Sequence, residues 1–190
     1  MRPRRPSTRF IPALVALFAL AVAALLALGA ADPASAAAPP FKGSVHAIDA
    51  PLKARMIRSG SWKPGVPVNI GQLRLLRLTY WGFDGKAHSG HLMVNRQYAR
   101  PMVGVFAKLY AAKFPIRRMR LIDAYGASDH KSMAADNTSA FNGRYVSGTT
   151  RWSMHAYGLA IDINPVENPY VSGSHVSPAA GARYADRNLK

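Results

Sequence analysis

The segment Arg151-Trp-Ser-Met-His-Ala-Tyr-Gly-Leu-Ala-Ile-Asp-Ile-Asn-Pro-Val-Glu-Asn-Pro-Tyr170 holds a histidine and an aspartate on either side of a glycine. Its run from 160 to 164 predicts a buried strand that the next proline ends, because isoleucine is β-branched and proline cannot continue a ladder. Alternation along that strand puts Asp162 on the face opposite the isoleucines. His155 lies on the loop that enters the strand and can turn back over Gly158, where no Cβ obstructs the turn.

A histidine nitrogen and a carboxylate oxygen that converge in this way form half of a tetrahedral zinc site. A buried carboxylate also needs a cation or several hydrogen-bond donors beside it. The same two residue types at this spacing also occur in proteins without a metal, in a capped turn before a core strand. The spacing alone therefore leaves a zinc site and an ordinary turn both open.

The order Ser153-x-His155-x-x-Gly158-x-Ala160-x-Asp162 resembles the signature of the zinc D-alanyl-D-alanine carboxypeptidase and L-alanyl-D-glutamate endopeptidase family. The resemblance continues upstream over residues 136–144 and downstream over residues 168–170. It implies the hedgehog/DD-peptidase fold, which is α+β with a small antiparallel sheet and flanking helices. It also implies a zinc metallopeptidase (Zn²⁺ as cofactor) that hydrolyses peptidoglycan stem peptides at a bond next to a D-amino acid.

The same resemblance assigns roles to residues of this chain. His155 and Asp162 are the expected zinc ligands, and Arg144 is the expected catalytic residue that binds substrate and stabilises the oxyanion. A guanidinium suits that role because it can donate two parallel hydrogen bonds to developing charge or to a substrate carboxylate. Ser153 is expected to orient the loop or to hydrogen-bond groups behind the ligands. The family more often has cysteine at the position of Gly143, which is a minor departure.

The family's third zinc ligand is a histidine further along the chain, in a short motif whose preceding acidic residue acts as the general base. No such motif occurs before Lys190, and His175 is the only histidine after Asp162. We expect the sequence to be truncated, with the third ligand and the general base beyond residue 190. The alternatives are that His175 substitutes, or that the protein is a non-catalytic cell-wall-binding module with an incomplete metal site. The choice between carboxypeptidase and endopeptidase depends on the shape of the pocket.

Residues 1–36 have the features of an export signal. Four arginines lie at its start, an apolar run covers residues 10–31, and Ala34-Ser35-Ala36 offers a cleavage site. Because that run is long enough to span a bilayer, an uncleaved N-terminal anchor is the alternative. Both interpretations predict an exported protein, extracellular or associated with the cell wall, that contacts a membrane only through this segment.

The chain has no cysteine, so an exported domain without disulfides depends on its core, with a bound metal as a further source of stability. Residues 37–190 hold 21 Lys and Arg and 8 Asp and Glu, which gives a net charge of +13. Such a charge attracts anions, and an exported protein first meets anionic wall polymers and peptidoglycan carboxylates. A merely solvated basic surface accounts for the charge equally well. The export signal argues against nucleic acid as a partner.

Residues 37–69 are rich in Pro, Gly and Ser and are predicted to form a linker and an irregular approach to a peptidase-like domain at residues 70–190. In that domain, alternating patterns predict strands over residues 73–83 and 86–94, and Asp84-Gly85 between them predicts a hairpin turn. An apolar stripe at three- and four-residue steps then predicts a helix that starts near Pro101, with Asn95 as its cap.

His88 and His91 lie three residues apart on the second predicted strand, so they face opposite sides of the sheet and cannot bind one metal together. Residues 121–125 are predicted to form another strand that ends at Gly126. The polar stretch 127–150 is a long loop without a pattern of its own, and loops of this length are usually functional or disordered.

Overall fold

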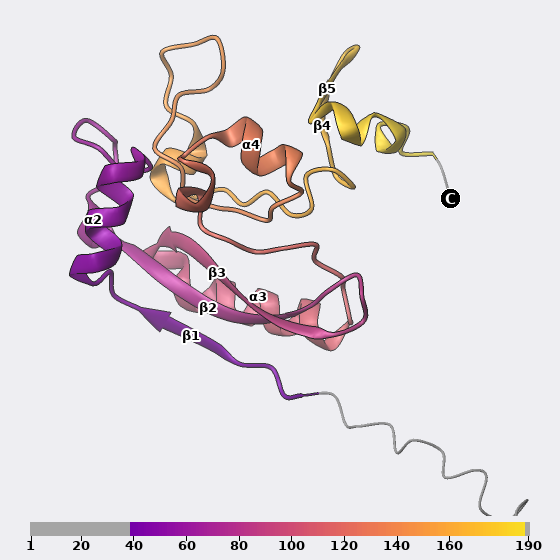
Figure 1. The fold of residues 1–190 in the computed structure, drawn as a ribbon, viewed down its shortest axis with the longest axis horizontal. Helices are drawn as coiled ribbons and strands as arrows, with labels where there is room; N and C mark the ends of the chain where they lie inside the picture. The colour runs from indigo at the N-terminus through magenta and orange to yellow at the C-terminus, as the bar shows by residue number, and fades with distance from the viewer. Residues whose placement is uncertain (1–38, 189–190) are drawn as a thin grey trace, which may run out of the picture. The chain divides into compact units, whose positions relative to one another are not determined.

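The computed structural model describes residues 39–188 (Figure 1). The export signal predicted over residues 1–36 lies outside the described residues. Within residues 39–188, none of the helices combines the length and the apolar character that crossing a membrane requires. The architecture is α+β, as predicted, with a small antiparallel sheet flanked by helices.

Three antiparallel strands form the sheet in the order β1-β2-β3: β1 (Gly43–His46), β2 (Leu73–Trp81) and β3 (Ala87–Asn95). The predicted hairpin of β2 and β3 is confirmed, and Gly85 takes the positive φ of +69° that its turn requires. Leu76 pairs with Leu92 and Arg77 pairs with His91. Adjacent positions therefore alternate between a leucine-lined face and a basic face.

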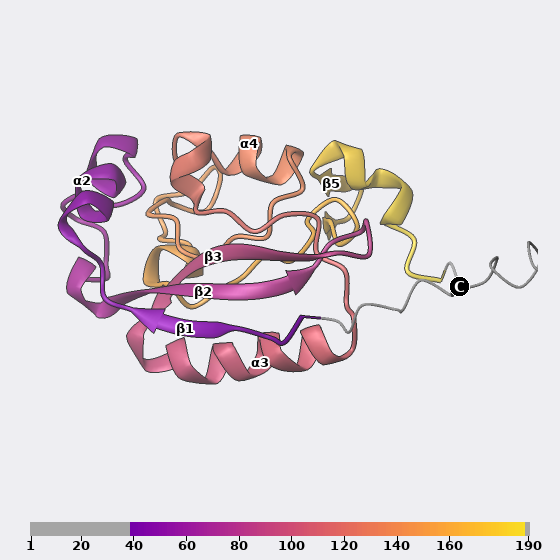
Figure 2. The same ribbon diagram turned by 60° about the horizontal axis from the view of Figure 1, so that its bottom comes forward.

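Helix α3 (Ala99–Ala111) lies along the leucine-lined face of the sheet (Figure 2). Its Phe106 is 1% exposed and packs in the main core. The sheet contributes four fully buried side chains to this core: Leu76, Leu78, Leu92 and Val94. Asn95 caps the short helix η2 (Arg96–Tyr98) that precedes α3, rather than α3 itself. The predicted helix is confirmed, but the predicted capping residue, Asn95, caps the helical turn that precedes it.

The other face of the sheet carries exposed side chains, among them Arg77, Ser89 and His91. Helix α4 (Asp129–Ala134) and irregular chain lie beyond the β3 edge of the sheet, and helix α2 (Ala50–Ser59) lies at one end (Figure 1). A second core joins α2 to the sheet through Met56, which is 1% exposed. Its other buried members come from separate parts of the chain: Val68, Leu73, Leu75, Met93, Leu121 and Phe141. The short helix η1 (Ile70–Gln72) leads from α2 into β2.

Four expectations for individual segments differ from the structure. The polar stretch 127–150 is predicted to be a loop, yet it contains α4, which Ser128 caps through the amide of Lys131. Residues 37–69 were expected to be irregular, yet they include β1 and α2, which Asp49 caps through the amide of Leu52. Residues 121–125 contain the 3-10 helix η3 (Ile122–Tyr125) in place of a strand, although Gly126 does end it with φ +62°. A run of five residues is too short for its apolar pattern to distinguish a helical turn from a strand.

The buried strand predicted over residues 160–164 is not formed: the segment makes a single bridge, between Asp162 and Ser139, and residues 160–163 are half-buried. Asn164 has a φ of +45°, so the backbone turns away before a ladder can continue. The chain then forms the small hairpin of β4 (Tyr170–Ser172) and β5 (His175–Ser177), followed by the 3-10 helix η5 (Ala179–Tyr184).

Candidate active site

His155 lies in the 3-10 helix η4 (Met154–Tyr157), and its two neighbours in the motif close both ends of this helix. The Ser153 hydroxyl oxygen accepts a hydrogen bond of 3.3 Å from the His155 amide, which is the action of an N-cap. Gly158 ends the helix with φ +68°, and its carbonyl accepts from the Asn95 amide at 3.0 Å. The turn that carries His155 is thereby held against the end of β3.

The imidazole of His155 is buried, with 11% of the side chain exposed. Its Nδ1 donates a hydrogen bond to the carbonyl oxygen of Ala140, which can only accept. Nδ1 therefore carries the hydrogen, and in the neutral ring the lone pair lies on Nε2. Histidines that bind metals commonly have their other nitrogen fixed by a backbone carbonyl in this way.

The carboxylate of Asp162 faces that lone pair. His155 Nε2 and Asp162 Oδ2 are 3.3 Å apart, and a third of the Asp162 side chain is open to solvent. The backbone of Asp162 is held by two hydrogen bonds with Ser139, of 2.9 and 3.0 Å. The structure thus brings together the two residues that the sequence predicts as zinc ligands, one on a helical turn and one on extended chain.

This contact places two electron-rich atoms next to each other whenever His155 is neutral, so a positive charge between them stabilises the pair. Burial lowers the pKa of His155, but the hydrogen bond and the charge of Asp162 outweigh it, and the pKa is raised overall. The positive charge of Arg144 acts against that increase. The pair can hold either a proton or a metal ion that accepts nitrogen and oxygen ligands.

Arg144 lies near this pair, and its guanidinium already binds other groups of the protein. Its Nη2 forms an ion pair of 2.8 Å with Asp129 Oδ2, and its Nη1 donates to the Tyr145 carbonyl at 3.2 Å. Its Nε is buried and has no hydrogen-bond partner in the described part of the chain. The Arg144 carbonyl accepts from the Ser153 amide at 3.1 Å, so the arginine and the cap of η4 are directly connected.

His88, His91 and His175 lie apart from this pair. His88 and His91 point to opposite faces of the sheet, as predicted: His88 stacks on Tyr80 and contacts Asp84, whereas His91 pairs with Arg77. His175 begins β5, is exposed, and lies 6.5 Å from the ring of Tyr170. Among residues 39–188, no three His, Cys, Asp or Glu side chains come close enough to hold one metal ion.

Three contributors to this site were not apparent from the sequence. The Ala140 carbonyl fixes the His155 tautomer, Asp129 binds Arg144, and the Asn142 amide donates to the His155 carbonyl at 3.1 Å. Two of these groups are backbone atoms, which carry no sequence signal. Asp129 lies fifteen positions before Arg144, at the start of α4, and only the tertiary fold shows that the two meet.

Residues 147–190 match the model of the D-alanyl-D-alanine carboxypeptidase family. The match includes Ser153, His155 and Asp162 and begins just after Arg144. It supports the resemblance to that family and a peptidase, and hence hydrolase, function. No curated protein and no solved structure matched the chain.

Proposed function

We propose that this protein is a zinc-dependent peptidase that hydrolyses peptidoglycan stem peptides at a bond next to a D-amino acid. The proposal rests on one observation: the Nε2 of His155 and the Oδ2 of Asp162 converge within 3.3 Å, inside the segment that matches the carboxypeptidase family. The hydrogen bond from Nδ1 to Ala140 leaves Nε2 as the nitrogen available to a metal.

The nitrogen of His155 and the oxygen of Asp162 are donor atoms of the kinds that bind zinc. A neutral imidazole and a carboxylate are ligands that zinc accepts, and catalytic zinc sites have three protein ligands with one position left open. His155 and Asp162 would supply two of them. Bound zinc lowers the pKa of its water to about 7 and polarises a carbonyl group, which is the chemistry that amide hydrolysis needs. Because a ligating histidine must be deprotonated, metal binding competes with the proton that the pair otherwise holds.

The roles of the other residues follow from their contacts. Ser153 and the Ala140 carbonyl set the position and the tautomer of His155. Arg144 would donate to the oxyanion or to the substrate's carboxylate, with Asp129 holding its guanidinium until substrate arrives. A carboxylate of the substrate can replace Asp129 at Arg144, because either carboxylate can accept two parallel hydrogen bonds from the guanidinium.

A non-catalytic cell-wall-binding module is the second candidate function. The observation that favours it is that only two metal ligands converge within residues 39–188. In that case the His155–Asp162 contact would be a buried ion pair that stabilises η4 without holding a metal. Both proposals place the protein outside the cytoplasm, because residues 1–36 resemble an export signal.

Hydrolysis assays on the full-length gene product separate the two candidates. Peptides ending in D-Ala-D-Ala and peptides containing an L-Ala-D-Glu bond are incubated with the protein, and the products are identified by mass spectrometry. We expect His155→Ala to abolish hydrolysis while the circular dichroism spectrum stays unchanged. His88→Ala is the matched control, because His88 also contacts an aspartate but is 41% exposed. Unchanged turnover in His155→Ala rules out the peptidase proposal.

A further inference from the structure

A basic trough runs across the described surface, beside the exposed face of the sheet. Three hollows of 390, 300 and 430 Å³ follow one another. The first and second share Arg55 and His91, and the second and third share Arg120. Because neighbouring hollows have lining residues in common and the first and third have none, the three lie in a row over α2, the β2–β3 hairpin and the segment before η3.

The cations of the trough are brought together by regular structure. Arg55 and Arg58 are three residues apart on α2, so they lie on the same side of that helix. Arg77 and His91 are directly paired across β2 and β3, so they share one face of the sheet. Two arginines on one side of a helix repel each other and destabilise it. Their accumulation here therefore works against stability.

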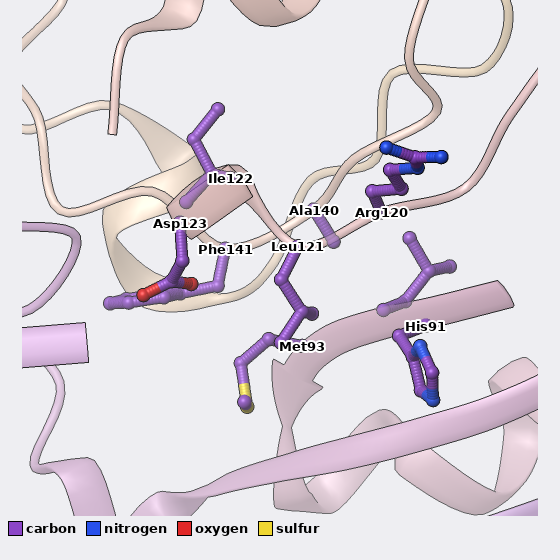
Figure 3. Close-up of a pocket in the computed structure, with 9 residues that line it drawn as sticks. His91, Met93, Arg120, Leu121, Ile122, Asp123, Ala140 and Phe141 are labelled. Atoms are coloured by element: carbon purple, nitrogen blue, oxygen red, sulfur yellow. The ribbon is translucent and has the colours of Figure 1, made fainter. Parts of the chain in front are cut away.

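Figure 3 shows an adjoining pocket that shares lining residues with the second hollow; His91 from β3 and Arg120 lie on one side of it and Asp123 on the other. Leu121 and Met93 lie between them and form an apolar floor. Burial, together with the charges of Arg77 and Arg55, lowers the pKa of His91. The potential in the trough is therefore positive even while His91 is neutral.

Five of the six arginines that line the trough are not neutralised within the described part of the chain, whereas the sixth, Arg117, forms ion pairs with Asp136 and Glu167. Arg55, Arg58, Arg77, Arg118 and Arg120 form no ion pair there. The two acids at its edge have other roles: Asp49 caps α2, and Asp123 accepts hydrogen bonds from the hydroxyls of Ser59 and Ser61 at 2.8 and 3.0 Å. Five guanidinium groups thus remain available to an external anion.

We propose that this trough binds a linear polymer of phosphodiesters that carries no bases, of the kind formed by repeating polyol phosphates. Its length over three hollows fits a chain better than a small anion. A phosphodiester has two nonbridging oxygens that share one negative charge and project from the chain, so a guanidinium can donate a hydrogen bond to each of them. The surface would hold the protein on an anionic wall polymer, independently of whether the His155–Asp162 site is catalytic.

Nucleic acid fits the trough less well than a polymer without bases. Proteins that bind single strands stack the bases on exposed aromatic rings. Tyr80 is the sole Phe, Trp or Tyr that lines the three hollows; it is 8% exposed, and its ring stacks on His88 at 5.6 Å. The described part of the trough therefore offers charge without a platform for bases.

The test measures the binding of a fluorescent poly(glycerol phosphate) oligomer to the full-length protein by anisotropy, at several salt concentrations. In the triple variant Arg55→Gln, Arg77→Gln, Arg120→Gln, three phosphate contacts are lost. The slope of log K against log salt should fall in magnitude by about 2, because each contact contributes about 0.7. At about 0.1 M salt this corresponds to roughly 100-fold weaker binding.

The matched control is Arg96→Gln, Arg100→Gln, Lys108→Gln, which removes the same charge from exposed positions outside the trough. It should bind within a few-fold of wild type. Equal losses in both triple variants, or no binding by wild type, would overturn the proposal, because the trough would then not be a site. A single-stranded DNA or a polyglutamate of equal charge that binds as tightly as the polyol phosphate would also overturn it, by assigning the surface to another class of polymer.

Discussion

The replacement Gly158→Ala tests whether the turn between His155 and Asp162 is as tightly docked as the structure shows. Gly158 has a φ of +68°, and a Cβ there would lie 2.7 Å from the Asn95 amide nitrogen and 3.1 Å from a methyl carbon of Leu73. The first neighbour is backbone and cannot move aside alone. Relief therefore requires η4 to shift away from the end of β3, together with the imidazole that it carries.

The magnitude follows from three contributions. A left-handed conformation costs an alanine about 1–2 kcal/mol. Overpacking against fixed neighbours adds about 1–3 kcal/mol. Lengthening the hydrogen bond from the Asn95 amide to the Gly158 carbonyl, now 3.0 Å, adds about 1 kcal/mol. We expect Gly158→Ala to lower the free energy of unfolding by about 3–6 kcal/mol in total.

The control is Gly126→Ala. Gly126 ends the 3-10 helix η3 as Gly158 ends η4, with a φ of +62°, but a Cβ there would have no neighbour within 4 Å. Only the conformational contribution applies, so the expected loss is about 1–2 kcal/mol. Urea unfolding followed by circular dichroism measures both. Equal losses at the two glycines would refute the claim that η4 is held against β3.

Three further predictions concern the site and its supports. Burial, with the neighbouring Glu167, raises the pKa of Asp136 to about 6, so the stabilisation from this group is present below pH 4 and lost as the pH rises through about 6. In urea unfolding, wild type should lose at most about 3 kcal/mol more than Asp136→Asn between those values, and an equal pH dependence in the two proteins would contradict this. Ser153→Ala removes the cap of η4 and should cost about 1 kcal/mol in urea unfolding, whereas no loss would mean that the 3.3 Å contact is not a cap. Arg144→Lys should leave zinc content unchanged and lower kcat/KM about 100-fold, since an ammonium cannot donate the two parallel hydrogen bonds; an unaltered rate would remove Arg144 from the mechanism.

The sequence predicts those parts of the fold that local patterns determine. β2, the Asp84-Gly85 turn, β3 and α3 each combine a clear hydrophobic period with a suitable turn or cap, and all four are found where predicted. α2 was not predicted, because its apolar side is short: Leu52 and Met56 lie one turn apart in the second core, and Met56 alone is fully buried.

In the candidate site too, the sequence predicts the local features and not the contacts between distant segments. His155, Gly158 and Asp162 lie close in sequence, so their convergence needs only one turn and could be predicted. The tautomer of His155 depends on a carbonyl fifteen residues earlier, and the ion pair of Arg144 depends on where α4 lies. Such contacts follow from the packing of distant segments and have no local pattern.

The proposal that His155 and Asp162 hold a zinc ion is tested most directly by measuring bound zinc. The full-length gene product is purified without added chelator, and its zinc is quantified by mass spectrometry beside the variants His155→Ala, Asp162→Ala and His88→Ala. We predict one equivalent of zinc in wild type and in His88→Ala, and none in the other two. Zinc that is absent from wild type, or that persists when either His155 or Asp162 is replaced, would contradict the proposal.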